Sequence, residues 1–152
     1  MQAHLRIHAL HLLNIEETAQ LRDPAFYVPP SDEDIKAFDK RLPGCIEITP
    51  GKFRLDLTRS RNTLFNRCAK GVFARDFIHK VTKDKWYSFP PILNKYLDLD
   101  YVQHTFHGQM KHLIKVYKSR DATVIEERLR MVAYQGRKRT VWRVLLEELS
   151  AI

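Results

Sequence analysis

The stretch LDYVQHTFHGQMKHLIKVYK, Leu99 to Lys118, decides the predicted fold because its side chains separate onto two faces of a helix. At about 100° per residue, one side of the helix collects the apolar side chains, namely Leu99, Val102, Phe106, Met110, Leu113 and Tyr117. The other side collects imidazoles and ammonium groups, namely His104, His107, Lys111, Lys115 and Lys118. We therefore expect a helix that buries one face and presents a cationic face to its surroundings.

Three longer helices and one short one are predicted before this stretch. Residues 3–21 contain no glycine or proline, and residues 31–41 follow a proline-rich linker and begin with Ser31 as an N-cap. The third helix, over 62–81 and capped by Ser60 or Asn62, would bury one apolar face composed of Leu64, Phe65, Cys68, Val72, Phe73 and Phe77. On that face Cys68 is interpreted as an inert core residue.

Two short segments connect these helices. Near 45–57, apolar and polar residues alternate around Pro50-Gly51, which predicts a short extended or hairpin segment. Residues 92–97 predict a short apolar helix, and Asp98 or Asp100 would then cap the helix that follows. The predicted fold is mainly α, a compact helical domain with a helix-turn-helix-like core.

The last thirty residues have two interpretations. Thr123 and Glu126 form a capping-box pattern, which favours two helices that meet at Gly136. The alternative is a C-terminal hairpin at 128–145, which would make the fold a winged helix with Arg137 to Arg139 at the tip of the wing. The helical interpretation is preferred because the capping box and the terminal LLEEL both suit a helix.

Charge is distributed unevenly along the chain of 152 residues. Residues 1–50 contain five Lys/Arg and eight Asp/Glu, a net charge of −3, whereas residues 51–152 contain twenty-one and ten, a net charge of +11. We predict a mildly acidic N-terminal helical arm at 1–42 and a basic helical domain at 43–152. A cationic excess concentrated in this way favours a polyanionic partner.

The first functional hypothesis is a nucleic-acid-binding domain, with double-stranded DNA as the first ligand and RNA as a variant. Lysine and arginine side chains on three consecutive segments would contact phosphates, and Gln and His on the long helix would reach base edges. The predicted contact residues are Arg67, Lys70, Gln103, His104, His107, Lys111, Lys115, Lys118, Arg137, Lys138 and Arg139. Such a protein is expected inside the cell, in the nucleus if the cell is eukaryotic, with a role in transcription regulation.

Two alternatives explain the same charges. Most charged helix faces are simply solvated. A helical protein-interaction module would instead use its basic face against an acidic protein, and the helix at 3–21 could form a homodimer or bind a partner to cover its apolar side.

Catalysis, metals and cofactors are not expected. The sequence contains no GxxxxGK[ST], GxGxxG or GxSxG motif. His104 and His107 have no glutamate arranged as in HExxH, and His4, His8 and His11 are interpreted as a surface stripe because no Asp, Glu or Cys lies nearby in the sequence. Two distant cysteines, and no apolar run long enough to span a membrane, indicate a reducing, intracellular location.

Overall fold

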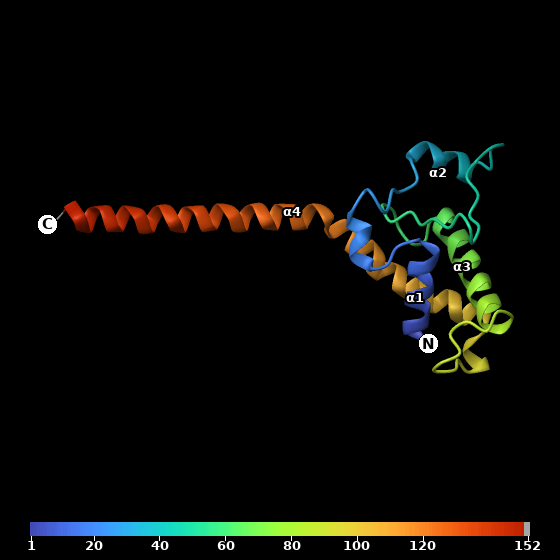
Figure 1. Ribbon diagram of the computed structural model, residues 1–152. Coiled ribbons are helices and arrows are strands. Elements are labelled where there is room, and N and C mark those ends of the chain that lie inside the picture. The colour runs from blue at the N-terminus through green and yellow to red at the C-terminus, as the bar shows by residue number, and fades with distance from the viewer. Residues whose placement is uncertain (151–152) are drawn as a thin grey trace. The chain divides into compact units, whose positions relative to one another are not determined.

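The computed structural model describes the backbone of residues 1–150 and the side chains of this range except 120–129, 132 and 138–150. It is mainly helical, as predicted (Figure 1). The elements are α1 Gln2–Leu12, the 3-10 helix η1 Thr18–Arg22, α2 Asp32–Asp39, α3 Leu64–Thr82, the 3-10 helix η2 Asn94–Tyr96 and α4 Leu99–Ser150. The chain forms two compact units, Met1–Lys118 and Ser119–Ile152, a division different from the predicted arm at 1–42 and domain at 43–152.

The helix predicted over 3–21 ends at Leu12, nine residues early. Asn14 adopts a left-handed backbone with φ 57°, which asparagine tolerates better than most residues. The amide of Asn14 then donates to the carbonyl of His11, and the amide of Ile15 donates to the carbonyl of Leu10 at 3.0 Å. This pair of bonds is a Schellman motif, which satisfies the last carbonyls of α1 and turns the chain so that Ile15 is buried.

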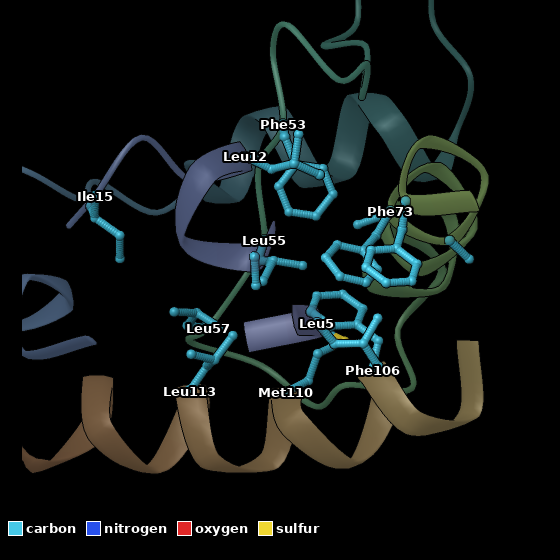
Figure 2. Close-up of a cluster of buried hydrophobic side chains, with 14 of the residues drawn as sticks. Leu5, Leu12, Ile15, Phe53, Leu55, Leu57, Phe73, Phe106, Met110 and Leu113 are labelled. Atoms are coloured by element: carbon cyan, nitrogen blue, oxygen red, sulfur yellow. The ribbon is translucent and has the colours of Figure 1, made fainter. Parts of the chain in front are cut away.

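The core of the first unit lies between α1, α3, the early turns of α4 and an extended segment (Figure 2). The rings of Phe73 on α3 and Phe106 on α4 are stacked with their centroids 3.7 Å apart. The predicted apolar face of the long helix is confirmed at Val102, Phe106, Met110 and Leu113, whereas Leu99 is exposed. Because α1 contributes Leu5, Ala9 and Leu12 to the same core, the N-terminal residues are part of the folded unit.

The predicted segment near 45–57 is extended and forms no regular strand among the described residues. One isolated antiparallel bridge joins Thr49 to Lys52 around Pro50-Gly51, and the alternating residues Phe53, Leu55 and Leu57 are buried. The hydroxyl of Tyr27 donates to the carbonyl of Leu55 at 2.7 Å and accepts from the amide of Leu57 at 3.2 Å. The proline-rich segment that contains Tyr27 is therefore packed against the core and is more than a linker.

The predicted caps are partly confirmed. Ser31 caps α2 in a capping box with Asp34, and Asp98 accepts a bond from the amide of Tyr101 at the start of α4. The cap of α3 is Thr63, whose hydroxyl accepts from the amide of Asn66, and neither Ser60 nor Asn62 has this role.

Cys68 is exposed, so its assignment to the core is wrong. The small residues Ala69 and Ala74 lie on the buried side of α3 instead.

The tail prediction also needs correction. The backbone of α4 is helical through Gly136 to Ser150, so the predicted break at Gly136 and the alternative hairpin at 128–145 are both wrong. A winged helix built on that hairpin is excluded with it. No helix in the described part of the chain has both the length and the apolar content needed to cross a membrane.

Candidate polyanion-binding surface

Core packing between α3 and α4 brings two rows of cations together. Phe73 and Phe106 stack at the centre of the interface. Lys70 lies one helical turn before Phe73, and His107 directly follows Phe106, so both emerge at the edge of the same contact. Arg61, in the turn before α3, reaches the same place. We call Arg61, Arg67, Lys70, His104 and His107 the cationic cluster.

Two hydrogen bonds organise the cluster around His107. The ammonium group of Lys70 donates to Nδ1 of His107 at 2.7 Å, so the imidazole accepts in its neutral form and keeps Nε2–H as a donor. The guanidinium of Arg61 donates to the backbone carbonyl of His107 at 2.9 Å. Three basic side chains are thereby held at one position on α4.

Burial and mutual repulsion lower the pKa of two members of the cluster. The pKa of Lys70 is lowered first by partial burial and then by the charges of Arg61 and Arg67. The pKa of His107 is lowered from its ordinary value of 6.5 by burial, and further by Lys70, Arg61 and His104. The charges of Lys70, Arg61 and Arg67 therefore repel one another here, and a bound anion would relieve this repulsion.

Among the described side chains, no carboxylate forms an ion pair with a residue of the cluster. The ion pairs found among the described side chains join His8 to Asp76, Arg59 to Asp32 and Asp56, and Lys80 to Asp84. Among these pairs, only the one between Asp32 and Arg59 includes an acidic residue of the first fifty positions. None of the five cluster residues takes part in these pairs.

A shallow hollow opens beside the cluster. Its volume is about 300 Å³, and it is lined by Lys70, Asp100, Gln103, His104 and His107. The ammonium, amide and imidazole groups can donate hydrogen bonds to the oxygens of a phosphate. Asp100 is the one acid in the lining.

Lys111, Lys115 and Lys118 continue the cationic face along α4, and all three are exposed. They follow His107 at spacings of four, four and three residues, away from the buried face. We call these three residues the lysine row.

The structure thus brings together five of the predicted contact residues, Arg67, Lys70, Gln103, His104 and His107, and places the lysine row on the same helix face as the two histidines. Arg137 is exposed in the second unit, and the side chains of Lys138 and Arg139 lie outside the described residues. Arg61 was not among the predicted contact residues, since the sequence gives no sign that it would reach His107.

The histidines of α1 differ from the prediction. His4 and His8 are buried and only His11 is exposed, so the predicted surface stripe is wrong. Nε2 of His8 donates to the carboxylate of Asp76 at 2.8 Å, and the hydroxyl of Tyr87 donates to Nδ1 of His8 at 2.9 Å.

Burial lowers the pKa of His8 to about 4, even though Asp76 opposes that shift, and burial raises the pKa of Tyr87 to about 12. His8 is therefore neutral at physiological pH. Because the His8 side chain is fully enclosed, this network joins α1, α3 and the loop after α3 as a structural element. Within the described residues no three His, Cys, Asp or Glu side chains are arranged to hold a metal ion.

Comparison with protein-family models, with curated proteins and with solved structures finds no match to this chain.

Proposed function

We propose that this protein binds nucleic acid, with double-stranded DNA as its first ligand, through the cationic cluster and the lysine row. The observation that carries the proposal is the Lys70–His107–Arg61 arrangement, in which basic groups are packed together and, among the described side chains, form no ion pair with a carboxylate. A protein gains little stability from such an arrangement, because partial burial and then the charges of neighbouring cations lower the pKa of Lys70 and of His107. A polyanion would compensate this repulsion on binding.

Phosphate contacts would supply most of the affinity. Each lysine or arginine that neutralises a phosphate releases condensed counterions, so affinity falls as salt rises. The cluster offers Arg61, Arg67 and Lys70, and the lysine row adds three exposed ammonium groups on α4. A surface of this composition supports contacts to several successive phosphates.

Base contacts would come from the first turns of α4. In a helix-turn-helix-like arrangement α4 would lie in the major groove, where Gln103 and His104 could donate to base edges. Gly108 has no side chain, and a Cβ placed there would meet nothing within 4 Å, so the helix is open at this point to close approach by a ligand. Gln109 is a weaker candidate because its amide donates to the backbone carbonyl of Gln2 at 2.9 Å.

A mobility-shift comparison of duplex DNA, single-stranded DNA and RNA at low and physiological salt tests the proposal. We expect binding to the duplex that weakens strongly between the two salt concentrations. If the protein prefers RNA or single-stranded DNA, the proposed surface still binds a polyanion, but double-stranded DNA is not its first ligand. Absence of binding to all three probes at low salt would contradict the proposal.

A second candidate function is recognition of an acidic protein by the later part of α4. Met131 and Tyr134 are each 59% exposed at helical spacing, and Arg130 and Arg137 flank them in the sequence. Exposed apolar and aromatic side chains beside arginine are common in protein interfaces. The earlier reason to expect pairing through α1 is weaker, since its apolar face is covered within the chain. Light scattering separates the two candidates, because a monomer that shifts DNA needs no protein partner.

A further inference from the structure

The only two cysteines of the chain line one hollow, although they are far apart in the sequence. Its volume is about 550 Å³, and its walls come from α2, the loop after it, α3 and Gln103 of α4. Cys45 lies on the loop and Cys68 on α3; both are free thiols, Cys68 exposed and Cys45 half-buried. Apolar residues that include Phe38, Ile46 and Val72 form much of the remaining wall.

The two cysteines are held differently. Cys68 lies in the first turns of α3, a helix of 19 residues whose opposite side is packed into the core. Cys45 follows Gly44, which has φ +77°, and the amide of Cys45 donates to Leu42 within the same loop. Among the described residues, the hydrogen bonds of segment 43–51 are all local and none reaches α3. The loop can therefore move toward the helix without losing a hydrogen bond to it.

We propose that Cys45 and Cys68 form a reversible intramolecular disulfide when a two-electron oxidant such as hydrogen peroxide reaches the hollow. This modification goes beyond nucleic-acid binding, although Arg67 and Gln103 of the proposed binding surface line the same hollow. A disulfide needs Cα atoms about 4.4–6.8 Å apart, so its formation draws the loop against α3. The loop would then be tied covalently to α3, which lines the same hollow.

The reaction balances in two steps. The thiolate of exposed Cys68 attacks one oxygen of peroxide, so that a sulfur–oxygen bond forms, the oxygen–oxygen bond breaks and hydroxide leaves. The thiolate of Cys45 then attacks the sulfur of the sulfenic acid, so that the sulfur–sulfur bond forms and a second hydroxide leaves. Each hydroxide takes up one of the protons that the two thiols released. Two thiols and one peroxide thus give one disulfide and two waters.

Mass spectrometry of the reduced full chain, treated with hydrogen peroxide at low protein concentration, tests this proposal. We expect the intact mass to fall by two hydrogen atoms. A non-reducing tryptic digest should then link the peptide Leu42–Lys52 to the peptide Cys68–Lys70, and dithiothreitol should separate them. We also expect the oxidised chain to melt at a higher temperature than the reduced chain, because the link restricts the unfolded state.

The variants Cys45→Ser and Cys68→Ser provide the controls, and each should lose the linked peptide pair completely. Circular dichroism before oxidation confirms that each variant is folded. The proposal is overturned if peroxide leaves both thiols of the wild-type chain open to alkylation. It is equally overturned if oxidation gives only dimers between chains, or only sulfinic acids.

Discussion

Nζ of Lys70 lies 2.7 Å from Nδ1 of His107, so two basic side chains share one hydrogen bond at the junction of α3 and α4. The two side chains stay together because the packing of the core holds α3 and α4 in contact. The stacked rings of Phe73 and Phe106 fix the two helices against each other. The resulting excess of positive charge is the physical basis of the proposed function.

Replacing Lys70 should change the titration of its neighbour. In Lys70→Gln the pKa of His107 should rise toward 6.5, because one repelling charge is removed and the imidazole becomes better solvated. Proton NMR of the imidazole measures this pKa directly. Lys83→Gln, which removes an exposed lysine just after α3, should leave it unchanged. A pKa of His107 that falls or stays constant in Lys70→Gln would show that Lys70 does not act on the imidazole.

Charge reversal in the lysine row should remove nucleic-acid binding. We expect Lys111→Glu combined with Lys115→Glu to weaken duplex binding by about a hundredfold or more at physiological salt, since two contacts are lost and two repulsions are added. Both residues are exposed, so the fold should remain intact. Fluorescence anisotropy measures the affinity, and circular dichroism checks the fold.

The matched control is Lys36→Glu combined with Lys40→Glu, which changes the net charge equally at two exposed positions at α2. This control should retain most of the affinity. Equal losses in the two double variants would mean that only net charge matters, and the proposed surface would then be wrong.

Stability should decrease in acid because His8 is buried in its neutral form. The pKa of His8 is about 4 in the folded chain against 6.5 without the fold, so between these values the unfolded chain binds more protons. The contribution of His8 to the free energy of unfolding is complete above pH 6.5 and is lost as the pH falls toward 4. The shift corresponds to at most about 3 kcal/mol. Urea unfolding at a series of pH values measures this loss.

His8→Gln should give a flatter pH dependence over the same range, whereas His112→Gln, which removes an exposed imidazole, should follow the wild type. A wild-type chain equally stable at both ends of the range would contradict the assignment.

Asn66 should be essential for the turn that carries Arg61. Its side-chain amide donates to the carbonyls of Asp56 at 2.8 Å and Ser60 at 3.0 Å, and its oxygen accepts from the amide of Asp56 at 2.9 Å. Because Asn66 is fully buried, Asn66→Ala leaves these backbone groups without partners and should cost about 3 kcal/mol of unfolding free energy.

Exposed Asn62 provides the comparison, since Asn62→Ala should change stability by less than about 0.5 kcal/mol. Chemical denaturation distinguishes the two variants. Similar values for both would show that the buried bonds of Asn66 contribute little.

The sequence predicted the features of this fold that depend on local periodicity. The apolar spacing of Val102, Phe106, Met110 and Leu113 is enough to identify the buried face of α4, and the alternation of Phe53, Leu55 and Leu57 is enough to identify the extended segment. Both patterns can be recognised because residues at the helical or extended spacing lie on the same face of their segment.

Features that depend on distant partners could not be predicted. His8 was expected on the surface because its partners, Asp76 and Tyr87, are 68 and 79 residues away. Cys68 was expected in the core because it shares a helix face with several apolar residues. The helix instead buries Ala69 and Ala74, whose small side chains contribute little to a hydrophobic pattern. The contact of Arg61 with His107 likewise spans 46 residues. Each of these contacts exists only after the helices have packed.

A salt titration of binding to a short duplex shows whether the cationic cluster and the lysine row bind phosphates. We expect the logarithm of the association constant to fall linearly with the logarithm of salt concentration, and Lys115→Gln to reduce the slope by about one. An affinity that stays the same between low and physiological salt would contradict this expectation.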